Sequence, residues 1–209
     1  MKEYHKIDTV FKRDPATGHK RLIMGDYSRP EFEYLAENQW VFTEKVDGTN
    51  IRVMVHPELG VSFAGRSDDA QMPPRLGRAL EAQFKPLEAA LLAQFPDGAC
   101  LYGEGFGATI QKGGGLYRPD QGFVLFDILV GEWWLERLTV DQLAIQFGIQ
   151  SVPIIGAGTL TQMIDAAQRG FNSTWGAFSA EGFVARPATE LRGRDGKRII
   201  TKIKHRDFA

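Results

Sequence analysis

Three short strings between positions 41 and 64 constrain the fold most, because they are rich in β-branched and aromatic residues and are separated by turn residues. They cover 41–45, 50–56 and 61–64, and each predicts a β-strand. Asp47 and Gly48 stand between the first two strings, and both tolerate a positive φ, so they predict a hairpin turn there. The chain is therefore expected to fold around antiparallel strands.

Farther along the chain, apolar residues recur at helical spacing between further strand-like strings. The predicted helices cover 76–95, 139–147 and 159–168. Thr139 and Thr159 are available as N-caps for the last two. The predicted strands cover 100–104, 122–130, 182–186 and 198–203, and the glycine-rich segment 112–115 is expected to be a loop. These elements predict an α+β fold of mainly antiparallel sheets with flanking helices.

Composition excludes several classes of protein. The single cysteine, Cys100, leaves no internal disulfide, and we expect an intracellular, cytoplasmic protein. No run approaches the ~20 apolar residues of a membrane helix. The 25 Lys and Arg nearly balance the 26 Asp and Glu, yet residues 186–209 hold eight basic against three acidic residues, a local net charge of +5. Such segregation predicts a basic surface for a polyanion, and an ordinary solvated face is the alternative.

The first candidate for chemistry is Lys45, which stands in the string TEKVDGTN at 43–50. Its Lys-x-Asp-Gly pattern is common when it occurs alone. Five further strings follow in order: GRS at 65–67, LYGEG at 101–105, FVLFDI at 123–128, AEGFV at 180–184 and ITKIK at 200–204. Their joint occurrence is much more specific than any one of them.

In this order, the six strings resemble the nucleotidyltransferase motifs of the covalent ligase superfamily, which comprises ATP-dependent DNA ligases, RNA ligases and mRNA capping enzymes. They span about three quarters of the chain. Asn50, five residues after the lysine, and the Gly-Glu-Gly context of Glu104 most resemble RNA ligases of the phage RNA ligase 2 and RNA-editing type. The resemblance implies an ATP-grasp-like nucleotidyltransferase fold and a single adenylyltransferase domain over 1–209.

The same resemblance implies a role for each motif residue. Lys45 would be the covalent nucleophile, with Asp47 and Gly48 as structural members of its motif. The residues expected to bind ATP or AMP are Glu44, Asn50, Arg66, Glu104, Phe126, Glu181, Lys202 and Lys204. Glu181 is also the expected ligand of Mg²⁺ or Mn²⁺, since a hard cation that bridges phosphates needs only one or two protein carboxylates. Arg198 and Arg206 are expected to contact a nucleic-acid backbone.

These residue types suit the chemistry on physical grounds as well. A neutral lysine amine attacks the α-phosphorus of ATP to give a phosphoramidate. A free lysine, with a pKa of about 10.4, is almost fully protonated at pH 7, so neighbouring positive charge, a metal or desolvation must lower that pKa. Lys202 and Lys204 alternate with Ile203 on a predicted strand and so project to one face, where they would supply such charge.

Each residue also has an ordinary alternative when it is considered alone. Phe126, in an apolar strand, is more often part of the core. Alternating Lys202 and Lys204 are a common protection of an edge strand. Glu104 and Glu181 are equally consistent with solvated acids at strand ends. Only their joint occurrence favours the ligase interpretation.

The sequence thus predicts an ATP-dependent RNA ligase that joins a 3′-hydroxyl to a 5′-phosphate through a lysine–AMP intermediate and an adenylylated 5′ end. Its expected partners are RNA ends or a nicked RNA-containing duplex, and no membrane. The alternatives are an ATP-dependent DNA ligase or capping-type nucleotidyltransferase, and a non-catalytic RNA-binding module with the ligase fold. Such ligases usually continue into an OB or helical domain, whereas this sequence stops five residues after Lys204. We therefore expect no C-terminal OB or helical domain, and a partner domain or protein in its place.

Overall fold

The computed structural model describes residues 2–208, which form two compact units. The first unit comprises residues 2–5 and 47–152, and the second comprises 6–46 and 153–208, so the chain passes between the units three times. Each unit contains a five-stranded sheet and a hydrophobic cluster of its own. That the chain acts as one adenylyltransferase domain remains a prediction.

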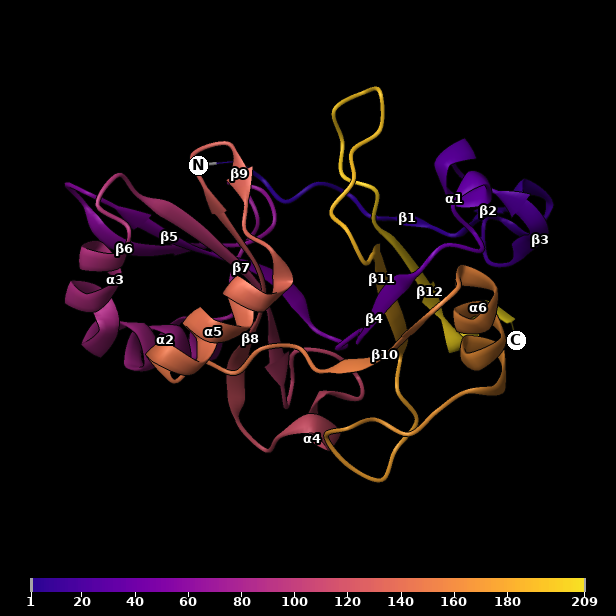
Figure 1. The fold of residues 1–209 in the computed structure, drawn as a ribbon. Coiled ribbons are helices and arrows are strands. Elements are labelled where there is room, and N and C mark those ends of the chain that lie inside the picture. Colours follow the sequence, from indigo (N-terminus) through magenta and orange to yellow (C-terminus); the bar gives the residue numbers. More distant parts are fainter. Residues whose placement is uncertain (1, 209) are drawn as a thin grey trace. The chain divides into compact units, whose positions relative to one another are not determined.

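The first unit is an antiparallel sheet with helices on one face (Figure 1). The strands, in spatial order, are β6 (Gly60–Ala64), β5 (Thr49–His56), β7 (Ala99–Gly107), β8 (Gln121–Val130) and β9 (Trp133–Trp134). The helices are α2 (Pro74–Phe84), α3 (Glu88–Gln94) and α5 (Arg137–Phe147), and the short α4 (Gly114–Tyr117) lies between β7 and β8 in sequence.

Alternation along the strands gives this sheet one apolar and one mixed face. Ile51, Val53 and Val55 of β5 are buried in the same cluster as the apolar residues of α2, α3 and α5. Asn50 and Arg52, the intervening residues of β5, therefore project from the opposite face. The helices thus leave that second face of the sheet for polar side chains.

The second unit is a sheet in the order β1 (Asp8–Thr9), β12 (Thr201–Lys204), β11 (Gly182–Pro187), β4 (Trp40–Glu44) and β10 (Ile154–Gly158). Only β1 and β12 pair in parallel; the other neighbours are antiparallel. A separate hairpin joins β2 (Phe11–Arg13) to β3 (Leu22–Tyr27). Helices α1 (Pro30–Tyr34) and α6 (Leu160–Arg169) contribute apolar residues to the cluster on this sheet. The predicted α+β class with mainly antiparallel sheets is confirmed.

The predicted hairpin at Asp47 and Gly48 is wrong. β4 pairs with β10 and β11, whereas β5 pairs with β6 and β7, so these consecutive strands belong to different sheets. Gly48 serves close packing instead, because a Cβ there would lie 2.3 Å from the carbonyl oxygen of Gly105 on β7. A turn-forming dipeptide in the sequence does not specify which strands pair.

Several element boundaries also differ from the predictions. The helix predicted over 76–95 is interrupted by a 3₁₀ turn, Lys85–Leu87, because Pro86 has no N–H to donate within a helix. The last strand begins at Thr201 rather than 198. α5 begins at Arg137 with Glu136 as N-cap, so Thr139 lies inside the helix. Thr159, in contrast, caps α6 as predicted and forms a capping box with Gln162.

The glycine-rich segment over 112–115 is only partly a loop, because its last two residues belong to α4. Across residues 2–208, no helix is both long and apolar enough to cross a membrane.

Candidate active site

Lys45 follows directly after β4, an interior strand of the second unit. Its backbone N–H donates to the carbonyl oxygen of Gly182, 2.9 Å away, which fixes Lys45 against the start of β11. Its Nζ donates to Oε2 of Glu181 at 2.6 Å. These two residues are 136 positions apart in sequence, and strand pairing between β4 and β11 brings them together.

The carboxylate of Glu181 is shared between two lysines. Lys204 Nζ lies 2.5 Å from Oε1, the oxygen that Lys45 does not contact, and Nη2 of Arg206 lies 4.0 Å from this same Oε1. Burial raises the pKa of Glu181, but the charge of Lys45 and the hydrogen bonds from Lys204 and Lys45 outweigh it and hold that pKa below its ordinary value. Lys45, Glu181 and Lys204 are called the lysine–glutamate cluster below.

The close approach of β11 to β12 positions this cluster. Gly182 is paired with Lys204 across the two strands, and His205 N–H donates to the carbonyl oxygen of Glu181. Gly182 has a φ of +155°, and a Cβ there would lie 2.1 Å from the carbonyl oxygen of Ile203. Only glycine fits this position without moving one strand away from the other.

Substitution Gly182→Ala is therefore expected to lower the free energy of unfolding by about 2 kcal/mol, because it adds both an unfavourable φ and a backbone clash. Gly131→Ala is the matched control, since Gly131 also has a positive φ, +56°, but nothing lies within 4 Å of the position that its Cβ would take. Urea unfolding of both variants measures the difference. Equal losses in the two variants would show that the close contact with Ile203 has no energetic consequence.

Lys202 and Lys204 share one face of β12, as predicted: both are half-buried, whereas the alternating Thr201 and Ile203 are buried. β12 lies between β1 and β11 in the sheet. Protection of an edge strand therefore does not explain Lys202, which is paired with Thr9 on one side and Val184 on the other.

The carboxylate of Glu44 forms hydrogen bonds to a loop. It is 1% exposed, and its carboxylate accepts hydrogen bonds from the hydroxyl of Ser173 and from both the N–H and the hydroxyl of Thr174. These bonds attach the segment that precedes Glu181 to β4. Sequence reasoning missed Ser173 and Thr174, because a lone Ser-Thr pair in a loop carries no specific signal.

Arg198 and Arg206 differ sharply in exposure. Arg198 is 3% exposed and its guanidinium forms an ion pair with Glu190, within the excursion between β11 and β12 that Figure 1 shows in yellow. This burial argues against a contact between Arg198 and a nucleic-acid backbone. The side chain of Arg206 is 71% exposed and is available for such a contact.

In the first unit, Asn50 and Glu104 are direct neighbours across β5 and β7. Cross-strand neighbours lie on the same face, with Cβ atoms about 5 Å apart. This is the face opposite the helices. Oδ1 of Asn50 is buried without a hydrogen bond to any residue in 2–208. Gly48 packs against the side chain of Glu104, since a Cβ at position 48 would lie only 2.7 Å from Cγ of Glu104. The pair thus offers a carboxylate beside an unsatisfied amide oxygen.

Phe126 lies on the face of β8 opposite the core, at a β-bulge that returns Ile128 to the core side. Tyr102 pairs with Asp127 and Gly103 pairs with Leu125, so Phe126 is the extra residue on β8. Phe123, Leu125 and Ile128 belong to the buried cluster beneath the helices, whereas Phe126 does not and is half-buried. Its ring meets the ring of Tyr4 edge-on, with centroids 5.0 Å apart. The core interpretation of Phe126 is therefore not supported.

Arg66 is exposed on a loop that a buried arginine holds in place. Arg52 is fully buried, its Nε donates to the carbonyl oxygen of Gly65 at 2.8 Å, and its Nη2 pairs with Asp68 at 2.6 Å. These contacts lie on either side of Arg66. Arg52 is a positioning residue that sequence reasoning missed, because within β5 only its alternation with apolar neighbours is visible.

Within residues 2–208, no group of three or more His, Cys, Asp or Glu side chains could hold a metal ion. Glu181 stands alone as a carboxylate in the lysine–glutamate cluster. A cation at this place would have to take most of its ligands from phosphate oxygens and water, which is the usual mode for Mg²⁺.

In a comparison with protein families, the model described as RNA ligase matches residues 38–204. This range contains every motif string identified in the sequence. A comparison with curated proteins gives no match.

Solved structures of Naegleria gruberi RNA ligase are similar in fold. An apo mutant superimposes with a TM-score of 0.67 at 19% identity, over 99% of this chain and 58% of that one. A mutant with ATP and Mn superimposes with a TM-score of 0.67 at 20% identity, over 98% of this chain and 56% of that one. The protein with PPi superimposes with a TM-score of 0.66 at 21% identity, over 97% of this chain and 57% of that one. The present chain thus spans somewhat more than half the length of these structures.

Proposed function

Because the chain belongs to the RNA ligase family, we propose that it is an ATP-dependent RNA ligase in which Lys45 carries AMP covalently. The proposed substrates are RNA ends or a nicked RNA-containing duplex, in the cytoplasm. The observation that carries the proposal is the lysine–glutamate cluster, in which the motif lysine shares one carboxylate with a second lysine. The Naegleria gruberi structures with ATP and Mn, and with PPi, support the choice of nucleotide.

In the first step, Nζ of Lys45 forms a bond to the α-phosphorus of ATP while the bond to the bridging oxygen breaks. Pyrophosphate leaves with the electron pair, and the amine loses a proton to solvent. Before this attack the ammonium group of Lys45 must lose a proton to solvent, since it has no lone pair, and this loss of charge ends its ion pair with Glu181. Lys204 competes for the same carboxylate and so weakens the hold of Glu181 on Lys45.

The two later steps transfer AMP onward. An oxygen of the RNA 5′-phosphate bonds to the phosphorus of AMP while the P–N bond to Lys45 breaks and the amine regains a proton. The 3′-hydroxyl oxygen of the other RNA end then bonds to the 5′-phosphorus and loses its proton, while the bond from this phosphorus to the bridging oxygen breaks and AMP leaves with that oxygen. Lys202 and Lys204 stabilise negative charge on the transferring phosphate, because they share one face of β12.

A divalent cation, Mg²⁺ or Mn²⁺, would be held by Glu181 together with phosphate oxygens and water, and would neutralise charge at the reacting phosphate. Both oxygens of Glu181 are paired with lysines, so a cation would take this place once Lys45 is adenylylated and has lost its charge.

The first unit supplies the proposed contacts to the nucleoside. Phe126, outside the core, provides an aromatic face for adenine, worth about 1–3 kcal/mol. Glu104 accepts hydrogen bonds from ribose hydroxyls, and the unsatisfied Oδ1 of Asn50 accepts a further one. Arg66 contacts phosphate. A further domain or a partner protein assists in binding the RNA ends, and Arg206 contacts the RNA backbone.

Incubation with ATP labelled at the α-phosphate, followed by denaturing electrophoresis, tests the proposal. Label from α-labelled but not γ-labelled ATP is expected on the full chain in Mg²⁺ or Mn²⁺. Labelling by GTP in place of ATP would favour a capping-type enzyme. No label with either nucleotide, and no sealing of pre-adenylylated RNA, would contradict the enzyme class and favour a non-catalytic RNA-binding module.

The choice of nucleic acid needs a second assay, because adenylylation does not report it. Nicked duplexes with RNA, DNA or a hybrid strand at the 3′-hydroxyl side are compared at equal concentration. RNA at this side is expected to be sealed faster. Equal sealing of all-DNA nicks would favour a DNA ligase.

A further inference from the structure

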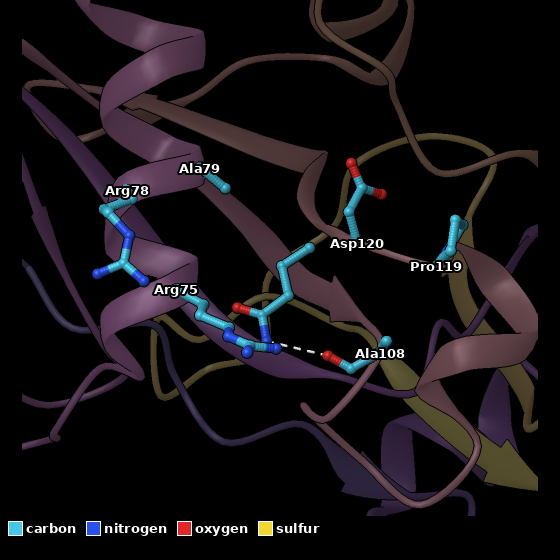
Figure 2. A pocket seen from close by; sticks show the side chains of 7 residues that line it. Arg75, Arg78, Ala79, Ala108, Pro119 and Asp120 are labelled. Atoms are coloured by element: carbon cyan, nitrogen blue, oxygen red, sulfur yellow. Dashed lines mark hydrogen bonds between the residues drawn. The ribbon is translucent and has the colours of Figure 1, made fainter.

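A pocket of about 340 Å³ lies in the first unit, outside all the motif strings (Figure 2). It is lined on one side by α2 and on the other by the ends of β7 and β8. The lining residues are Arg75, Arg78, Ala79, Ala108, Pro119, Asp120 and Gln121. No residue of this pocket has a role in the reaction described above.

The α2 side of the pocket carries uncompensated positive charge. Arg75 and Arg78 are exposed, lie three residues apart on α2 and so occupy neighbouring positions on one face of the helix. Neither forms an ion pair with another residue of 2–208. Figure 2 shows Arg75 extending from α2 towards Ala108, with Asp120 and Pro119 on the opposite side. Two free guanidinium groups in one pocket are suited to an anion with several oxygens.

The start of α2 adds to this positive charge. Its N-cap, Pro73, makes no side-chain hydrogen bond to the helix, and the first turn contains no acidic residue. The partial positive charge of the helix N-terminus is therefore not balanced by a side chain. Arg75 lies in this first turn, so the helix terminus and the guanidinium group act in the same place.

The carboxylate that lines the pocket is already neutralised. Asp120 accepts two hydrogen bonds from Arg118, at 2.5 and 2.8 Å. The hydrogen bond from Arg118 lowers the pKa of Asp120, although burial opposes it slightly. Asp120 thus pairs with Arg118 and not with Arg75 or Arg78, so these two arginines are available for a ligand.

The opposite wall is held rigidly. Nε2 of Gln121, which is 9% exposed, donates to the carbonyl oxygen of Ala108 and to the hydroxyl of Thr109, each at 2.9 Å. Ala108 N–H donates to the carbonyl oxygens of Arg118 and Asp120. The end of β7 and the start of β8 are thereby joined by hydrogen bonds.

The pocket is separated along the sheet from the proposed nucleotide contacts. Gln121 precedes Phe126 by five residues on β8, which corresponds to roughly 17 Å at ~3.3 Å per residue. Glu104 is paired with Val124, three residues from Gln121, or about 10 Å along the strand. The phosphate of AMP is already assigned to Lys202 and Lys204. This assignment and the separation of Arg75 and Arg78 from the nucleoside contacts favour the substrate strand as the source of an anion.

We propose that Arg75 and Arg78 bind a backbone phosphate of the RNA strand in this pocket. The proposal rests on the proposed RNA ligase function, which supplies a polyanionic substrate. It assigns to α2 a strand contact that lies outside the six motif strings. Because a phosphate contact carries no sequence information, the pocket positions the strand rather than selecting its sequence.

The test uses the full chain with the double substitution Arg75→Ala/Arg78→Ala. Binding of a fluorescein-labelled single-stranded RNA is measured by anisotropy over a series of KCl concentrations. Affinity is expected to fall on the order of 10-fold at 0.1 M salt, and the slope of log K against log[salt] is expected to flatten by about 0.7, the change for one lost phosphate contact on a single strand.

The matched control is Arg21→Ala/Arg169→Ala, which removes two exposed arginines of the second unit and changes the net charge equally. It is expected to leave the salt slope nearly unchanged. An equal loss in both double variants would overturn the proposal, since net charge alone would then explain the effect. Unchanged RNA binding by the α2 variant would overturn it as well.

A second measurement distinguishes the strand from the nucleotide as the source of the phosphate. The KM for ATP in self-adenylylation is expected to be the same in the α2 variant and in the unmodified protein. A raised KM with unaltered RNA binding would assign the pocket to the phosphates of ATP instead and overturn the proposal. RNA binding is measured without ATP, so a protein that fails to adenylylate itself contradicts the proposed function but leaves this result interpretable.

Discussion

Substitution Lys45→Ala is expected to reduce covalent labelling by ATP by about 10³-fold or more, because it removes the only atom proposed to form the bond to AMP. This atom, Nζ, also forms the ion pair with Glu181. Lys45→Arg is expected to be equally inactive although it keeps the charge, since a guanidinium group is not deprotonated in proteins. The measurement is label retained on the denatured protein.

The control for this prediction separates folding from chemistry. Both variants are assayed for sealing of pre-adenylylated RNA, which bypasses the first two steps. Residual sealing together with lost labelling is expected. Label that persists in Lys45→Ala would show that another residue is the nucleophile. Loss of the folded state, detected by circular dichroism in Lys45→Ala but not in Lys45→Arg, would leave the arginine variant as the informative one.

Substitution Glu181→Gln is expected to have the second-largest effect, because it leaves the two ammonium groups of Lys45 and Lys204 close together without the carboxylate between them. Breaking a largely buried ion pair by removing one partner costs about 3 kcal/mol of stability. Labelling by ATP is expected to fall on the order of 10²-fold, since the same change removes the proposed cation ligand. Urea unfolding and the labelling assay measure the two effects.

The stability effect has a defined pH dependence. The pKa of Glu181 in the folded protein is below its ordinary value of 4.5. Its contribution to stability is therefore fully present above pH 4.5 and is lost as the pH falls through the lower folded-state pKa. The difference in unfolding free energy between the unmodified protein and Glu181→Gln should accordingly shrink on acidification in this range.

A matched control supports that interpretation. Glu132→Gln removes an exposed glutamate whose ion pair with Lys2 is long, at 3.7 Å, so little change in stability or labelling is expected. A difference for Glu181→Gln that is constant with pH, or no larger than that for Glu132→Gln, would contradict the proposed charge balance of the cluster.

Patterns of local origin could be predicted from the sequence, and those that depend on distant partners could not. The strands on both sides of Lys45 follow from β-branched and aromatic residues, and the common face of Lys202 and Lys204 follows from alternation. The pairing of β4 with β10 and β11 has no local signal, which is why the hairpin prediction at Asp47 and Gly48 failed.

The candidate site shows the same division. Lys45 and Glu181 are recognisable as members of motifs, but their ion pair depends on two strands 136 residues apart. The burial of Arg198 against Glu190 and the full burial of Arg52 are equally invisible in the sequence, because arginine is ordinarily exposed. Phe126 lies opposite the core residues Phe123 and Leu125, and the continuous apolar run around it does not reveal which of its residues face the core.

The three passages of the chain between the two units determine the order in which the protein can fold during synthesis. The first unit has all its residues once position 152 has been made, whereas residues 6–46 must wait for β10, β11 and β12. Until then β4, with Lys45 at its end, lacks all its strand partners and exposes unpaired backbone groups, a state prone to aggregation. The nucleophile is thus made early and is placed in a completed sheet only when the last strand arrives.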